Sequence, residues 1–164
     1  MKIINALIDN IGKWISILNI FLILLIVVDV ILRYSFNITE KWVIELEWHI
    51  FALVFLIGAS YTFQNDKHVR VDVFYQNYSE RKKVVVNLFG NLLFLIPWCL
   101  VVIYTSYKYA NVSFSYLEGS PDPGGLPARY LIKYSITLGF FLLLIQAISD
   151  SFVKLNTLIN RGWK

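Results

Sequence analysis

Residues 84–107, VVVNLFGNLLFLIPWCLVVIYTSY, contain no charged side chain and decide the fold class of this chain. A helix needs roughly 20 apolar residues to cross a hydrocarbon layer of about 30 Å. No water is available inside that layer, so the backbone must satisfy its own hydrogen bonds, as it does in a helix. The stretch therefore predicts a membrane-spanning helix, and Pro97 predicts a kink within it.

Three further apolar runs of similar length flank this stretch. Residues 14–32 contain one charged side chain, Asp29, and residues 131–149 contain one, Lys133. The chain is 57% hydrophobic and 16% charged, whereas average soluble domains are about 25% charged. We predict an all-α membrane protein that forms one compact bundle. Its single domain, residues 1–164, is expected to have spans at about 12–34, 42–64, 84–107 and 128–152.

Basic residues predict the orientation in the membrane, because Lys and Arg accumulate in short cytoplasmic loops. With the amino terminus inside, ten basic residues face the cytoplasm and five face outward. The inner ten are Lys2, Lys13, Lys67, Arg70, Arg81, Lys82, Lys83, Lys154, Arg161 and Lys164, and the outer five are Arg33, Lys41, Lys108, Arg129 and Lys133. We therefore predict that both termini are cytoplasmic. The net charge of +4 reflects this bias and contact with anionic lipid, so we expect no nucleic-acid partner.

The connection between the second and third spans has a pattern of its own. Four apolar or aromatic residues recur there at helical spacing with polar residues among them, namely Val71, Phe74, Tyr75 and Tyr78. A helix of this kind lies in the headgroup plane with its aromatic side towards the acyl chains. We predict an interfacial amphipathic arm at about residues 66–80. A short strand is the alternative, since valines alternate with polar residues over 68–73.

The connection between the third and fourth spans, predicted at residues 108–127, carries the strongest turn signals in the chain. Its last part, EGSPDPGGLP at residues 118–127, has three prolines, which fix φ, and three glycines, which permit positive φ. We predict consecutive tight turns on the outer surface. The composition fits two interpretations equally well. The segment is either a plain connection between spans or a shaped surface that another protein recognises.

Ionisable side chains gather near the outer end of the first two spans. Asp29 and Arg33 are four residues apart, so they lie on one helical face and can pair. Glu45, Glu47 and His49 begin the second span at the same depth, within reach of Arg33 across a short hairpin. Snorkelling and local pairing explain such groups near a boundary. A proton relay is the functional alternative, but it also needs polar groups at mid-depth, of which the spans offer few.

Small residues inside the spans predict where helices approach one another closely. Gly58, Ala59 and Ser60 in the second span and Gly139 in the fourth leave room for a neighbouring backbone. We expect these residues at contacts between helices or between subunits.

The sequence has none of the motifs that mark common enzymes and cofactor proteins. No metal-binding, phosphate-binding or nucleophile motif occurs, and the single cysteine, Cys99, has no partner for an intramolecular disulfide. The two histidines, His49 and His68, are predicted at opposite faces of the membrane, which excludes paired haem ligation within one chain. We expect neither enzymatic activity nor a cofactor in this chain.

Several of these residues follow one another in an order that resembles a known family. The order is Arg33-Tyr34-Ser35-Phe36, Trp42, Glu45, Glu47, Gly58-Ala59, His68, Asp72, residues 120–129, Lys133, Gly139-Phe140 and Gln146. Over nearly its whole length the chain is similar to the small membrane subunit of tripartite ATP-independent periplasmic (TRAP) transporters, the DctQ family. One departure is the spacing of Glu45 and Glu47, since the family often has adjacent acidic residues after the tryptophan.

The resemblance implies a subunit of a sodium-driven transporter in the bacterial inner membrane. A large membrane subunit would carry the substrate and sodium sites, and a periplasmic solute-binding protein would deliver an organic acid. This chain would brace the large subunit, and its outer loop would help to dock the binding protein. The implied docking residues are Ser120, Asp122, Gly124, Gly125 and Arg129. The loop resembles versions that handle sialic acid, while C4-dicarboxylates are the general substrates of the family.

Two other functions compete with that of a noncatalytic subunit. A small self-assembling channel or transporter would form a symmetric homo-oligomer and move solute by itself. An intramembrane electron-transfer subunit would bind haem or quinone. The sequence favours the accessory subunit, because four spans enclose little volume, and solute transporters usually have interrupted helices and repeats that this chain lacks.

Overall fold

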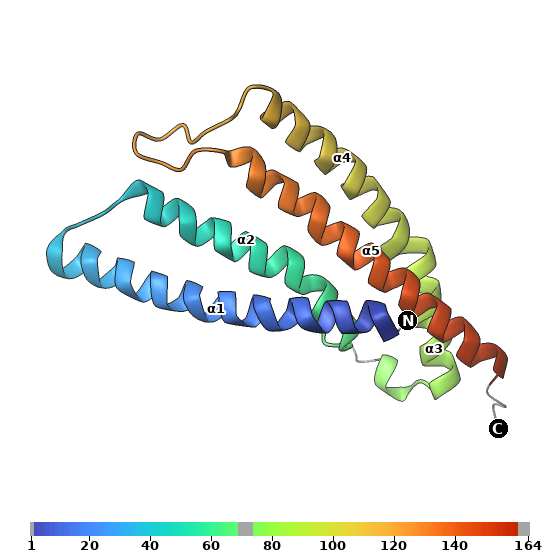
Figure 1. The fold of residues 1–164 in the computed structure, drawn as a ribbon. Helices are drawn as coiled ribbons and strands as arrows, with labels where there is room; N and C mark the ends of the chain where they lie inside the picture. The colour runs from blue at the N-terminus through green and yellow to red at the C-terminus, as the bar shows by residue number, and fades with distance from the viewer. Residues whose placement is uncertain (1, 69–73, 161–164) are drawn as a thin grey trace.

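A computed structural model describes residues 2–68 and 74–160 as four long helical segments (Figure 1). The first segment is α1, Lys2–Phe36, and the second is α2, Lys41–Gln64. The third runs without a break through α3, Glu80–Gly90, η2, Asn91–Leu95, and α4, Ile96–Ser115, and the fourth is α5, Arg129–Asn160. A short 3₁₀ turn, η1, Tyr75–Asn77, precedes α3.

All four segments are long and apolar enough to cross a membrane. The prediction of a helical protein with four spans is therefore confirmed. The third segment continues to Ser115, into the predicted outer loop at 108–127. Falling hydropathy marks the edge of the hydrocarbon layer but does not end a helix, whose backbone hydrogen bonds continue into the interface. The loop before α5 is correspondingly shorter, at residues 116–128.

Local backbone geometry ends α4. Leu117 has a φ of 50°, in the left-handed region. Its N–H donates to the Phe114 carbonyl at 3.0 Å, and the Glu118 N–H donates to the Ser113 carbonyl at 3.1 Å. These two bonds form a Schellman motif, which satisfies the last carbonyls of a helix and turns the chain away. The motif directs the chain into the loop that precedes α5.

The four segments lie in a single layer in the order α1, α2, α5, α4 (Figure 1). Each packs mainly on its neighbour in this row, and α1 and α4 lie at opposite edges. The prediction of one compact bundle is therefore wrong. Lipid tolerates apolar side chains all round a helix, so hydropathy does not require the row to close. Polar contacts and close backbone approaches decide which helices are neighbours.

Gly139 shows such an approach between α5 and α2. A Cβ atom at this position would lie 2.7 Å from the Leu56 carbonyl oxygen and 2.9 Å from its carbon. Only a glycine lets the two backbones come this near. A Cβ atom at Gly58 would lie 3.4 Å from the Ile15 Cγ2 atom of α1, an ordinary contact distance. Ser60 is fully buried. The predicted close packing is thus tightest at Gly139.

The third segment contains a π-helical turn at Asn91–Leu95, shortly before Pro97. Proline cannot donate a backbone hydrogen bond to the carbonyl four residues earlier, so the regular helix is disturbed there. The irregularity that the sequence predicts at Pro97 takes this form. Asn91 is buried within the turn, and its amide donates to the Asp150 carboxylate of α5 at 2.7 Å.

The predicted arm at 66–80 lies partly outside the described residues. Its described end is not one continuous helix, because η1 is followed by Tyr78 in an extended conformation and by Ser79, which caps α3. The alternative strand at 68–73 falls almost entirely outside the described residues. The structure therefore does not show the arm as a helix of that length.

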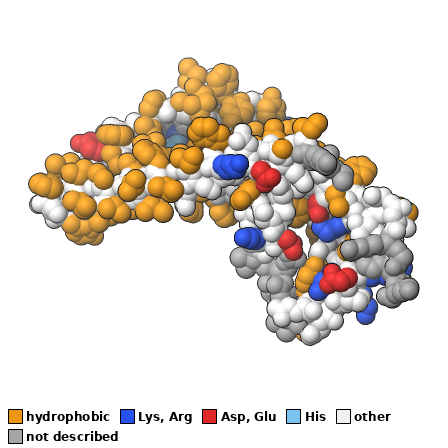
Figure 2. All heavy atoms as spheres, turned by 60° about the horizontal axis from the view of Figure 1, so that its bottom comes forward, with side chains coloured by type: hydrophobic (Ala, Val, Ile, Leu, Met, Phe, Trp, Pro, Cys, Tyr) orange, Lys and Arg blue, Asp and Glu red, His pale blue; other side chains and the backbone are white. Residues whose placement is uncertain are grey.

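The row has two ends of different chemistry. The loop end carries the connections at 37–40 and 116–128, and the terminal end carries the first and last described residues, together with α3 (Figure 1). Charged side chains visible in Figure 2 gather mostly towards the terminal end, while apolar side chains cover much of the rest. The predicted cytoplasmic side corresponds to the terminal end, and this orientation stays a prediction.

Candidate functional site

Glu45, in the first turns of α2, anchors the loop that connects α4 to α5. Its side chain is buried. The carboxylate accepts a hydrogen bond from the Ser120 hydroxyl and another, of 2.6 Å, from the Leu126 backbone N–H. One buried carboxylate thus ties the second helix to both sides of a loop that begins some 70 residues later.

The loop closes on itself through backbone hydrogen bonds. Ser120 N–H donates to the Leu126 carbonyl at 3.0 Å, and Arg129 N–H donates to the Glu118 carbonyl at 2.8 Å. At the tip, a further bond of 3.0 Å joins Gly125 N–H to the Asp122 carbonyl. The tip has a proline followed by a glycine with a φ of 77°, as in a type II turn. The predicted tight turns are therefore confirmed.

Gly125 is tightly enclosed beside the Glu45 anchor. A Cβ atom at this position would lie 2.8 Å from the Glu45 Oε2 atom and would also collide with the Ser120 side chain. The glycine is required because the loop backbone passes directly over the carboxylate that holds it. This explains one of the glycines that the composition of the loop singled out.

A second anchor holds the base of the loop. The Glu118 carboxylate accepts hydrogen bonds from Lys133 of α5, from Ser113 of α4 and, at 2.9 Å, from the Tyr116 hydroxyl. The Lys133 ammonium also lies 4.3 Å from the centre of the Tyr109 ring. The single charge of the apolar run at residues 131–149, Lys133, is therefore paired with a carboxylate at the start of the loop.

This second anchor should depend on pH. Hydrogen bonds from Lys133, Ser113 and Tyr116 lower the pKa of Glu118 from 4.5 to about 2. A carboxyl with a lowered pKa stabilises the anchored state above its ordinary pKa, and this stabilisation is lost as the pH falls through the lowered value. We expect amide-hydrogen exchange in residues 116–128, corrected for intrinsic rates, to be slow at neutral pH and to accelerate only between pH 4.5 and about 2.

The matched variant for the pH experiment is Lys133→Met, which removes the cation but keeps most of the side-chain volume. The carboxylate then lacks its strongest partner, so its pKa lies closer to 4.5; the acceleration should be smaller and should end at a higher pH than in the parent protein. Equal protection from neutral pH down to about pH 2 in the parent would contradict the role of Glu118.

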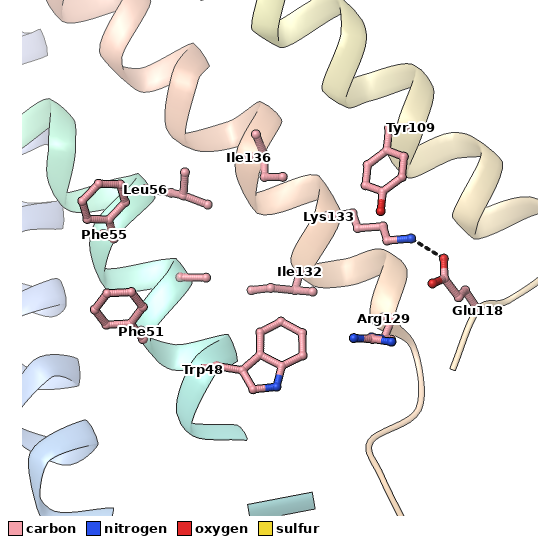
Figure 3. Close-up of a pocket in the computed structure, with 11 residues that line it drawn as sticks. Trp48, Phe51, Phe55, Leu56, Tyr109, Glu118, Arg129, Ile132, Lys133 and Ile136 are labelled. Carbon is pink, nitrogen blue, oxygen red and sulfur yellow. Dashed lines mark hydrogen bonds and ion pairs between the residues drawn. The ribbon is translucent and has the colours of Figure 1, made fainter. Parts of the chain in front are cut away.

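A groove of about 560 Å³ runs from the loop end along the contact between α2 and α5 (Figure 3). Arg129 lies at the loop end of the groove, and its guanidinium lies 5.5 Å from the centre of the Trp48 ring. Farther from that end the lining is mostly apolar. The lining residues include Phe51, Phe55, Leu56, Ile132 and Ile136. A guanidinium over an aromatic face is a favourable contact that leaves its N–H groups available to an anion.

The other predicted docking residues surround these anchors. Asp122 and Gly124 lie at the exposed tip of the loop, and the Asp122 backbone N–H donates to the Ser120 hydroxyl at 3.1 Å. The structure therefore brings Ser120, Gly125 and the loop tip together with Glu45, which the sequence analysis had grouped with the ionisable residues of the first two spans.

The predicted pair of Asp29 and Arg33 on α1 is present. Among the described residues no ion pair joins Arg33 to Glu45 or Glu47, and of these two glutamates only Glu47 lies within electrostatic reach of it. Glu45 is occupied by the loop instead. Glu47 lies within electrostatic reach of Asp29 and Arg33, but its Oε1 atom is buried without a hydrogen-bond partner among the described residues.

The remaining predicted site residues have local contacts. His49 Nδ1 lies 2.5 Å from the Glu45 carbonyl oxygen, one helical turn earlier, and its ring centre lies 3.9 Å from that of Trp48. The Ala59 carbonyl oxygen lies 3.1 Å from His68 Nε2, just beyond the other end of α2. These contacts give a structural role to each residue.

Sequence analysis missed three polar contacts at the terminal end. Asp150 of α5 accepts hydrogen bonds from Asn91 and from Lys154. Gln64 of α2 donates to the Asp9 carboxylate of α1 at 2.8 Å. The i, i+4 spacing of Asp150 and Lys154 could have indicated their pairing, but no pattern signals a contact between residues far apart in sequence.

These features define a multi-pass helical membrane protein whose polar groups hold a loop and join helices. The chain belongs to the DctQ component family of tripartite ATP-independent periplasmic transporters, whose family model matches residues 22–157. No curated protein matches the sequence. The family consists of transporter components, and a tripartite transporter implies two further components, a large membrane subunit and a periplasmic binding protein.

Proposed function

We propose that this chain is the noncatalytic small subunit of a sodium-coupled TRAP transporter in the bacterial inner membrane. It braces the large membrane subunit, which carries the substrate and sodium sites, and it helps to dock the periplasmic solute-binding protein. The cargo is an organic acid, of the sialic acid or C4-dicarboxylate class that the loop and the family resemblance suggest. The chain itself needs no cofactor.

The observation that carries this proposal is the open row of helices. A protein that moves solute by itself must surround the solute at mid-depth, usually with broken helices that line a cavity. Here each helix packs mainly on its neighbours in one layer, and both faces of that layer are available to lipid or protein. Such a layer is suited to lie against a larger membrane protein.

The anchored loop supports the docking role. Two carboxylates, Glu45 and Glu118, hold a loop that carries an exposed aspartate at its tip. Loops positioned by a rigid scaffold are common binding surfaces. Because two anchors fix this loop, a partner does not need to order it on binding, which lowers the entropic cost of association.

Asp122→Ala is expected to weaken docking of the binding protein. The Asp122 side chain is exposed at the loop tip, so its removal should leave the fold intact and reduce electrostatic complementarity. A rim charge typically affects association, so we expect a several-fold slower association rate in surface plasmon resonance with the reconstituted membrane complex. Glu40→Ala, an exposed acid on the neighbouring connection, is the control. Equal rates for Asp122→Ala and the parent would count against docking at the tip.

The function itself is tested by affinity purification of the tagged chain from membranes that also express the large subunit. We expect the two membrane subunits to elute together in a constant ratio. A symmetric assembly of this chain alone would instead support a self-assembling channel or transporter.

A further inference from the structure

Two neighbouring grooves lie on one face of the helix row. The first, of about 560 Å³, runs between α2 and α5, and the second, of about 460 Å³, runs between α1 and α2. Phe55 lines both grooves, so it forms the ridge between them. Figure 3 shows Phe55 on α2 beside the first groove. On this face the Phe55 side chain therefore separates two adjacent grooves.

Asn19 of α1 lines the second groove and lies exposed within a membrane-spanning helix. Its amide forms no hydrogen bond with any residue that the structure describes. At 1.5 Å of helix rise per residue, Asn19 lies about 8 Å beyond Trp14, where the apolar run begins. An amide with two donors and an acceptor is costly in hydrocarbon, and this short side chain does not reach the interface.

Two other polar side chains of this groove, Ser16 and Thr62, are satisfied by their own helices. Ser16 donates to the Gly12 carbonyl at 2.9 Å, and Thr62 donates to the Gly58 carbonyl at 3.1 Å. An asparagine amide in mid-helix has no equivalent local solution here. Asn19 therefore requires a partner beyond the residues that the structure describes, and acyl chains provide none.

The shape of the groove fits a helix as that partner. Three lining residues have little or no side chain, namely Ser16, Gly58 and Ala59, whereas the space beside Gly12 is filled by the Tyr61 ring. Small residues let the backbone of another helix approach closely, and polar side chains such as asparagine form hydrogen bonds across helix contacts in membranes. The groove between α1 and α2 thus lets another helix approach closely and presents the Asn19 amide to it.

We propose that the groove between α1 and α2 receives a transmembrane helix of the large membrane subunit, and that this helix supplies a polar side chain to the Asn19 amide. The inference rests on the proposed function, because that function provides the membrane partner. It adds the contact surface and the depth of the contact. Phe55, which forms the ridge, lies against the same partner.

Photo-crosslinking in membranes that express both subunits tests the surface. A benzophenone-bearing phenylalanine analogue replaces Phe55, or as a control Phe21, which is exposed at a similar depth but points about 160° away from Asn19 around α1. We expect Phe55 to crosslink to the large subunit and Phe21 to crosslink to lipid. The surface is wrong if Phe55 yields lipid adducts only, or a crosslink to a second copy of this chain.

Substitutions at Asn19 test the hydrogen bond. Interhelical hydrogen bonds in membranes are modest, so Asn19→Leu should weaken co-purification of the large subunit about three- to tenfold, and Asn19→Gln should restore most of it. Equal recovery with Asn19→Leu and the parent overturns the role of Asn19. The large subunit could co-purify with the parent while Phe55 fails to crosslink to it and Asn19→Leu leaves its recovery unchanged. The proposed contact surface is then wrong, while the proposed function stands. If it does not co-purify at all, the proposed function fails.

Discussion

Gly139→Val is expected to reduce the yield of folded protein several-fold and to lower its thermal midpoint. Even an alanine Cβ would lie 2.7 Å from the Leu56 carbonyl oxygen and 2.9 Å from its carbonyl carbon. Backbone atoms cannot rotate away, so α2 and α5 must move apart. Overpacking of this kind costs about 1–3 kcal/mol, and valine adds two methyl groups to the clash. Scanning fluorimetry and size-exclusion chromatography of the detergent-purified protein measure both effects.

Gly90→Ala is the matched control for this prediction. Gly90 also lies in a helical segment, but a Cβ atom there would meet nothing within 4 Å. Alanine in a helix is favoured over glycine by about 1 kcal/mol, so this change should leave the midpoint equal or higher. An unchanged midpoint in Gly139→Val would show that α2 and α5 do not approach as closely as described.

Glu45→Gln is expected to release the outer loop without preventing membrane insertion. The carboxylate accepts from both Ser120 and the Leu126 N–H, whereas a glutamine amide has a single oxygen. Its NH₂ group then faces either the Leu126 N–H or the Ser120 hydroxyl, whose own proton must turn away. A buried donor left without an acceptor costs about 1–3 kcal/mol. That cost corresponds to roughly 5- to 150-fold faster amide-hydrogen exchange at Leu126, if exchange occurs by local opening.

Two further variants make this experiment specific. Gly125→Ala should produce the same release, because its Cβ would collide with the groups that form the anchor. Glu40→Gln removes an exposed acid at the same end and should leave exchange at Leu126 unchanged. Parent-like exchange in both Glu45→Gln and Gly125→Ala would mean that Glu45 does not hold the loop.

The four spans could be predicted from the sequence because hydropathy reports directly on transfer into lipid. The tight turns at residues 118–127 were equally accessible, since proline and glycine act through local backbone geometry. The pair of Asp29 and Arg33 followed from helical spacing alone. Each of these features depends on residues close together in the sequence.

The arrangement of the helices could not be predicted in the same way. Lipid accepts apolar residues on every side of a helix, so the pattern carries no information on whether a row closes into a bundle. Glu45 shows the same limit. Its predicted depth in the membrane suggested Arg33 as its partner, but its hydrogen-bond partners are Ser120 and Leu126 in a loop distant in sequence. Only the packing of α2 beside α5 brings these residues together.

The signal for the second anchor was present but incomplete. Lys133 was the only charge in the fourth apolar run, and an ionisable group at such a position requires a partner. The sequence does not reveal that Glu118 supplies it, because the Schellman turn at Leu117 sets the direction of that side chain. The left-handed φ at a leucine has no sequence signature comparable to a glycine.

Solute uptake into proteoliposomes tests the central claim most directly. The small subunit alone, both membrane subunits with the periplasmic binding protein, and the large subunit with the binding protein are reconstituted under a sodium gradient and supplied with a radiolabelled organic acid. The account predicts uptake only when all three components are present. Uptake by this chain alone would contradict it, because a single row of helices would then be carrying the cargo by itself.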